Sequence, residues 1–166
     1  MRELSKVLES QALIRFQDCD PYQHLNNSKY IDYFLNARED QISAHYGLDV
    51  YKMAREKKIS WVVGQHQIGY LKPAFFMEMV NIQTQLIQYT ERSVQVEMRM
   101  YDEHKTALQA VLWTTFVHVH LLQNRTEKHA EELMSLFAAI HAPIQEENFE
   151  ARLLIFRKQP SITSNN

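Results

Sequence analysis

The clearest pattern in the chain is an apolar stripe with helical spacing across residues 28–46. Its members recur at intervals of three and four positions: Tyr30, Ile31, Phe34, Ala37 and Ile42. This spacing places them on one face of a helix. Asn26 or Asn27 can cap its start by accepting a free backbone N–H, and Gly47 can end it in a left-handed conformation. We expect a shorter helix over residues 50–57.

Residues 59–122 follow the pattern of strands. Between residues 93 and 101 apolar and polar side chains alternate, which is typical of an antiparallel strand with one buried face. Hairpin turns are expected at residues 89–92 and 102–105. In residues 107–122 both the odd-numbered and the even-numbered positions are largely apolar, which indicates a central strand covered on both faces.

One more strand and one more helix complete the expected order. We predict a first strand over residues 12–17 and a C-terminal helix over residues 127–141. A long helix with one apolar stripe and about five antiparallel strands bury their apolar faces best when the sheet wraps around the helix. The fold class is therefore α+β. We expect this unit to span residues 1–125, with residues 126–166 as a helical extension of the same domain that ends in a flexible tail at 161–166.

The composition of the chain excludes several classes of function. The chain has 166 residues and a formal net charge of -2, so it lacks the basic surface typical of nucleic-acid-binding proteins. A single cysteine, Cys19, excludes an intramolecular disulfide and a four-cysteine zinc site. We find no secretory leader and no run apolar enough to span a membrane. We expect a cytoplasmic protein with no nucleic-acid or membrane partner.

The candidate chemistry lies in residues 18–27, immediately before the long helix. This segment contains two carboxylates, an imidazole and two carboxamides: Asp18, Asp20, His24, Asn26 and Asn27. Free N–H groups and the positive end of the helix dipole point at such a loop and can stabilise an oxyanion. A neighbouring carboxylate can serve as general base or nucleophile. The alternative is that these residues only form a turn and a cap.

The motif Asp20-x-x-x-His24-Leu25-Asn26-Asn27-x-x-Tyr30 resembles the signature of hot-dog-fold thioesterases of the 4-hydroxybenzoyl-CoA thioesterase class. The Gln23-His24 pair is also similar to plant-type acyl-ACP thioesterases. The later Ile68-Gly69-Tyr70-Leu71-Lys72-Pro73-Ala74 resembles a second segment of the first family. Most of that family has glycine where this chain has Gln23, so we expect the loop to do without a positive φ there.

The resemblance implies a hot-dog fold and hydrolysis of an acyl-CoA or acyl-ACP with a fatty or aromatic acyl group. Asp20 matches the catalytic aspartate, which acts as nucleophile or as base for water. The backbone N–H of Asn27 matches the group that polarises the thioester carbonyl, and His24 matches the motif histidine. This reaction requires no metal or redox cofactor.

The same resemblance predicts the substrate-binding residues and the assembly. We expect Tyr30, His66, Tyr70, Arg92 and Ser93 to bind substrate, the last two near the coenzyme A phosphates. An unpaired sheet edge and the resemblance together predict a homodimer that assembles further into a tetramer or hexamer. The partner would then complete the site.

Two other functions remain open on this fold. A hydratase or dehydratase would use Asp20 and His24 to move protons beside an acyl thioester. A non-catalytic protein would bind acyl-CoA without turnover. His118 and His120 share one strand face and could bind a metal, but no third ligand has a useful spacing, so we favour structural roles.

Overall fold

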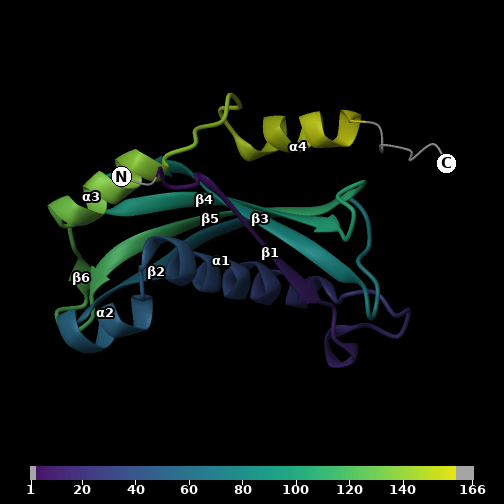
Figure 1. The fold of residues 1–166 in the computed structure, drawn as a ribbon, viewed down its shortest axis with the longest axis horizontal. Coiled ribbons are helices and arrows are strands. Elements are labelled where there is room, and N and C mark those ends of the chain that lie inside the picture. Colours follow the sequence, from purple (N-terminus) through teal and green to yellow (C-terminus); the bar gives the residue numbers. More distant parts are fainter. Residues whose placement is uncertain (1–2, 160–166) are drawn as a thin grey trace.

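The structure, a computed structural model, describes residues 3–159, in which an antiparallel sheet curls around one long helix (Figure 1). The strand order is β1-β3-β4-β5-β2, and a short strand β6 pairs with β5. The strands are β1 (Val7–Leu13), β2 (Ile59–Tyr70), β3 (Met79–Tyr89), β4 (Ser93–Asp102), β5 (Leu108–His120) and β6 (Arg125–Thr126). The pairings between these strands are all antiparallel. The predicted hot-dog architecture is thus confirmed.

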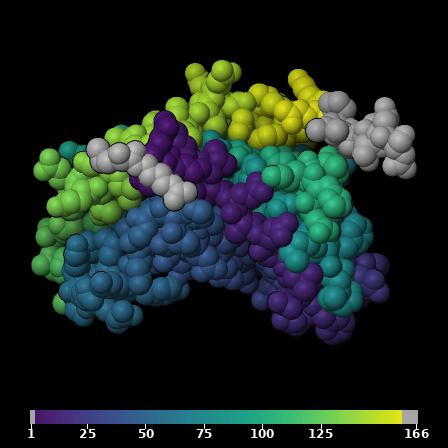
Figure 2. Space-filling view, viewed as in Figure 1, coloured from purple at the N-terminus to yellow at the C-terminus, as the bar shows by residue number. Residues whose placement is uncertain are grey.

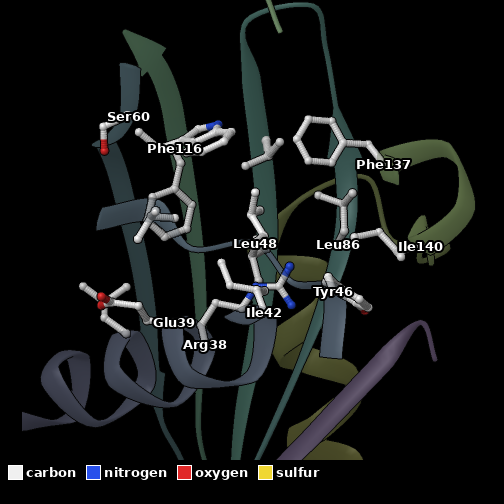
Figure 3. Close-up of a pocket in the computed structure, with 15 residues that line it drawn as sticks. Arg38, Glu39, Ile42, Tyr46, Leu48, Ser60, Leu86, Phe116, Phe137 and Ile140 are labelled. Atoms are coloured by element: carbon white, nitrogen blue, oxygen red, sulfur yellow. The ribbon is translucent and has the colours of Figure 1, made fainter. Parts of the chain in front are cut away.

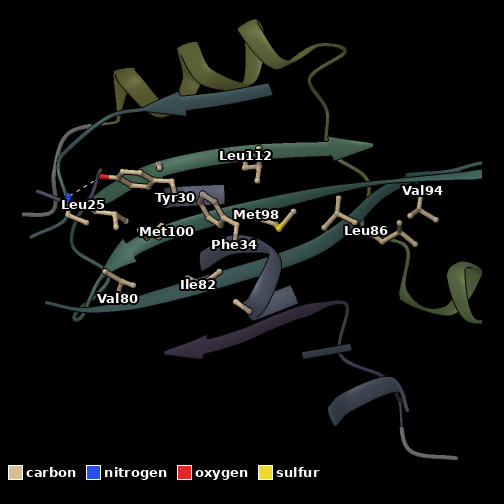
Figure 4. Close-up of a cluster of buried hydrophobic side chains, with 14 of the residues drawn as sticks. Leu25, Tyr30, Phe34, Val80, Ile82, Leu86, Val94, Met98, Met100 and Leu112 are labelled. Carbon is tan, nitrogen blue, oxygen red and sulfur yellow. Dashed lines mark hydrogen bonds between the residues drawn. The ribbon is translucent and has the colours of Figure 1, made fainter. Parts of the chain in front are cut away.

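The long helix α1 (Tyr30–Tyr46) follows a single 3-10 turn, Asn27–Lys29. The side chain of Asn26 caps this turn by accepting from the Ser28 N–H at 3.0 Å. Gly47 ends the helix with φ 66°, as predicted. The apolar face of α1 packs against the concave face of the sheet in one buried cluster (Figure 4). That cluster includes Tyr30, Phe34, Ile82, Met98, Met100 and Leu112.

The remaining helices are α2 (Val50–Lys57), α3 (Glu131–Ile140) and α4 (Phe149–Lys158). Helix α3 contributes Leu133, Phe137 and Ile140 to the same core as α1. Helix α4 lies along the opposite face of the sheet from α1 (Figure 1), which explains why β5 is apolar on both faces.

The pattern analysis did not predict α4. Phe149 and Leu153 are its buried residues, and they pack with Val111 and Trp113 in a second cluster. Helix α4 packs closely over Gly69 on β2, where an added Cβ would lie 2.6 Å from Cδ1 of Leu153 and would force that side chain to shift. Phe149, Leu153 and Phe156 follow helical spacing, but the exposed apolar Leu154 and Ile155 interrupt the pattern and hide this stripe in the sequence.

The first strand was placed wrongly at residues 12–17. It spans Val7–Leu13 and pairs with β3 from Val7↔Gln85 to Leu13↔Met79, while Phe16–Asp18 forms a 3-10 turn. Pairing with β3, far along the chain, sets the limits of this strand. Apolar and polar residues alternate poorly along its own sequence. In the space-filling view β1 crosses the surface in purple (Figure 2). The predicted tail at 161–166 lies outside the described residues. Among residues 3–159, no helix is both long and apolar enough to cross a bilayer.

Candidate active site

The loop between β1 and α1 is folded around the side chain of Asp20. One oxygen, Oδ1, accepts from the N–H of Tyr22 at 2.9 Å and from the N–H of His24 at 3.1 Å. The Asp20 N–H in turn donates to the His24 carbonyl at 2.8 Å. These bonds hold the carboxylate in one orientation at the start of the helix.

Gln23 takes the left-handed conformation that we expected this loop to avoid. Its φ is 65°, and its N–H donates to the Asp20 carbonyl at 3.0 Å. Its own carbonyl accepts from the Phe76 N–H at 2.9 Å. The expectation was wrong because these bonds offset a conformational cost of about 1–2 kcal/mol for a residue with a Cβ. The turn therefore accommodates a glutamine in the left-handed conformation.

The first turn before α1 contains backbone N–H groups that have no partner within the helix. The Ser28 N–H is bonded to the Asn26 side chain, and the Lys29 N–H donates to the Asn26 carbonyl at 2.8 Å. The Asn27 N–H has no acceptor within the helix, because it belongs to the first turn. An N–H at this position, beside the positive end of the helix dipole, can stabilise a negative charge.

Two tyrosines pack across the helix start. The Tyr70 hydroxyl donates to the Asn27 carbonyl at 3.0 Å, and the Tyr30 hydroxyl accepts from the Ala74 N–H at 3.2 Å. Their rings meet edge to face with centroids 5.1 Å apart. Burial raises the pKa of both hydroxyls, so both stay protonated at neutral pH. They position the first turn through hydrogen bonds.

These groups surround a surface depression of about 240 Å³. Of the predicted residues, the structure brings together Asp20, His24, Asn27, Tyr30 and Tyr70. The depression also contains Leu71, Lys72 and Pro73, to which the sequence analysis gave no role. All three belong to the segment of residues 68–74 that resembles the thioesterase family, and that resemblance could have identified them.

Asp18 has a structural partner. Its Oδ2 accepts from the Tyr33 hydroxyl at 2.7 Å, and that hydroxyl accepts from the Arg15 N–H at 3.0 Å. Burial and the bond to Asp18 raise the pKa of Tyr33 to about 12. Asp18 therefore fastens the loop to α1, and it does not line the depression.

The other predicted binding residues lie elsewhere in this chain. Arg92 and Ser93 follow the far end of β3, whereas the Asp20 loop bonds to residues just before its near end. The length of β3 separates these two places by roughly 30 Å. Arg92 donates to the Thr126 carbonyl at 3.3 Å, and His66 on β2 bonds to Thr114 at 2.9 Å. A single chain does not bring them to Asp20.

The two strand histidines also have other partners. Nδ1 of His118 bonds to the Glu127 carbonyl at 3.0 Å, and its ring packs against Trp61 and His129. Nδ1 of His120 accepts from the Gln123 N–H at 3.3 Å. Within residues 3–159, no three potential metal-ligating side chains form a group.

The chain is similar to known proteins in sequence and in fold. The sequence profile of the thioesterase-like superfamily matches residues 14–140. Long-chain acyl-CoA thioesterase FadM of Escherichia coli K12 is 29% identical over 86 residues, which cover 52% of this chain and 63% of FadM. The match thus spans less than two thirds of that relative.

Solved structures with the same fold include DHNA-CoA thioesterase from Staphylococcus aureus. It has a TM-score of 0.72 and 18% identity, over 80% of this chain and 87% of that one. The protein SAV2348 of the same organism, solved in complex with CoA, has a TM-score of 0.76 and 10% identity. That match covers 92% of this chain and 95% of the other.

Proposed function

The chain belongs to the thioesterase-like superfamily, and on that premise we propose that it hydrolyses acyl-CoA thioesters at the Asp20 depression. The observation that carries the proposal is the joint position of a carboxylate, Asp20, and a first-turn N–H, Asn27, in one depression. The likeness to FadM and to a CoA complex supports coenzyme A as the carrier, with acyl carrier protein as the alternative.

Two routes for hydrolysis are compatible with this arrangement. In the first, Asp20 takes a proton from water, whose oxygen then adds to the thioester carbonyl carbon. In the second, Asp20 adds to that carbon itself and forms an anhydride, which water then cleaves. In both, the Asn27 N–H stabilises the carbonyl oxygen as it gains charge. The C–S bond breaks, the sulfur keeps the electron pair, and coenzyme A leaves as a thiolate.

The remaining residues receive supporting roles in the proposal. His24 lines the depression, and its ring packs edge to face on Phe75 with centroids 4.9 Å apart, so we assign it to holding the loop and the acyl end. Tyr30 and Tyr70 hold the first turn. Arg92, Ser93 and His66 would act on substrate bound at the site of a partner subunit.

Release of free thiol from a panel of acyl-CoA thioesters tests the function. We expect hydrolysis of fatty or aromatic acyl-CoA, with a preference along the series that identifies the acyl group. A change in enoyl absorbance without thiol release would instead identify a hydratase or dehydratase. Binding of acyl-CoA with no turnover at all would identify a non-catalytic binding protein.

A homodimer is the expected assembly, because β2 is a long sheet edge with exposed apolar side chains. Val62 and Val63 on this strand are 45% and 44% exposed. Such an edge is normally covered or paired. Light scattering at low micromolar concentration should therefore give at least twice the chain mass of 19.7 kDa. An active species at the mass of one chain would contradict both the dimer and the shared site.

A further inference from the structure

A second cavity, of about 200 Å³, lies between α1 and the sheet, toward the C-terminal end of the helix (Figure 3). Apolar side chains form most of its wall, among them Ile42, Leu48, Leu86, Phe116, Phe137 and Ile140. None of the residues around Asp20 lines it. An apolar cavity of this size fits a medium-length aliphatic chain better than a drug-sized ligand.

The guanidinium of Arg38 lies in the wall of this cavity. Arg38 is only 8% exposed, and in Figure 3 its guanidinium extends to the centre of the apolar side chains. One nitrogen donates to Oγ1 of Thr84 at 3.0 Å, and the Tyr46 hydroxyl is a second hydrogen-bonding partner. Both partners are neutral, and burial lowers the pKa of Arg38 to about 10, so it stays charged at neutral pH.

In the part of the chain that the structure describes, this buried cation has no counter-ion. Among residues 3–159, none of the ion pairs includes Arg38. Glu39 lines the same cavity, but its carboxylate points away from the guanidinium (Figure 3). A buried charge is normally paired, since its desolvation is costly. The buried Arg99 follows this rule, because it pairs with Glu97, and so does the half-buried Arg152.

We propose that this cavity binds an aliphatic carboxylate, with the chain among the apolar side chains and the carboxylate paired with Arg38. The ligand would supply the missing anion and form charge-assisted hydrogen bonds that the guanidinium geometry favours. A neutral chain would leave the charge uncompensated. This site goes beyond the hydrolysis proposed above, because it does not require the Asp20 depression.

The same ligand chemistry has two possible sources. One is a free fatty acid, which is also the product class of the proposed reaction. The other is the ω-carboxylate of a dicarboxylic acyl chain whose thioester lies at the helix start. Arg38 is two turns along α1 from Tyr30, roughly 12 Å, a distance that an extended acyl chain can span.

Calorimetric titration with octanoate and with 1-octanol tests the site without hydrolysis. We expect octanoate to bind wild type at least about tenfold more tightly than octanol, as a charge-assisted pair implies. The variant R38M replaces the cation with a side chain of similar length, and it should lose this preference while it still binds octanol. Equal binding of octanoate and octanol by wild type, or an unchanged preference in R38M, would overturn the proposal.

Three controls place the ligand and identify its source. I42W should fill the cavity and weaken the binding of both octanoate and octanol, whereas D20N should bind octanoate as wild type does. Unchanged binding by I42W together with weakened binding by D20N would overturn the site. If R38M raises KM for dodecanedioyl-CoA but not for dodecanoyl-CoA, the carboxylate is the ω-group of the substrate. If R38M loses octanoate binding and changes KM for the two thioesters by the same factor, the bound carboxylate is that of a free fatty acid. Because octanoate binding needs no turnover, a failure of the proposed hydrolysis does not affect this test.

Discussion

Replacing Asp20 with asparagine is expected to lower kcat for acyl-CoA hydrolysis by at least about 100-fold. The asparagine oxygen can still accept the two backbone N–H bonds, from Tyr22 and His24, that hold the loop. The substitution removes only the anion that takes the proton or attacks the carbonyl carbon. Thiol release under saturating substrate measures the loss, and a thermal melt should show an unchanged fold.

Asp18→Asn is the matched control for this variant. Asp18 belongs to the same loop, but its carboxylate bonds to the Tyr33 hydroxyl and does not line the depression. The asparagine oxygen can accept the same bond, so activity should fall much less than in D20N. If D20N kept more than half of the wild-type turnover, Asp20 would be neither the base nor the nucleophile.

The part of the fold that depends on local interactions could be predicted from the sequence. The stripe of α1, the Asn26 cap and the Gly47 end all involve residues a few positions apart, and the structure confirms each of them. The alternating pattern also predicted a strand at residues 93–101, but the expectation that only one of its faces is buried was wrong, because α4 covers the polar face and Glu97 and Arg99 on that face are buried. The first strand was misplaced, since its limits depend on pairing with β3, far along the chain.

The same distinction between local and long-range interactions applies to the candidate site. Asp20, His24 and Asn27 are close in sequence, so their proximity could be predicted from one motif. Arg92 is remote from them because the length of β3 places its turn at the other end of the sheet. Arg38 has the helical spacing of the stripe, four positions after Phe34, but its charge argued against burial because arginine normally faces water. Only the fold of the sheet around α1 encloses it.

Substitution of Glu97 by glutamine is expected to lower the free energy of unfolding by about 3–5 kcal/mol. Glu97 lies on β4, beneath α4, and is fully buried. Oε1 accepts from Arg152 at 2.7 Å and from Arg99, while Oε2 accepts from Arg152 and from Trp113, each at 2.8 Å. Glutamine would leave the buried Arg99 without its anion, would leave the half-buried Arg152 with Glu146 alone, and would turn an amide N–H₂ toward donors. Urea denaturation measures the difference.

The control for E97Q is Asp32→Asn, which removes an exposed ion pair with Lys29 and should cost less than about 1 kcal/mol. The pH dependence adds a second test. Burial raises the pKa of Glu97, but hydrogen bonds from Arg152 and the charge of Arg99 outweigh it and hold the pKa below its ordinary value. Its stabilisation is therefore present above the unfolded-state pKa and is lost as the pH falls through the lower folded-state value. Wild type should lose stability more steeply than E97Q on acidification, and parallel curves would show that Glu97 does not hold α4 on the sheet as an anion.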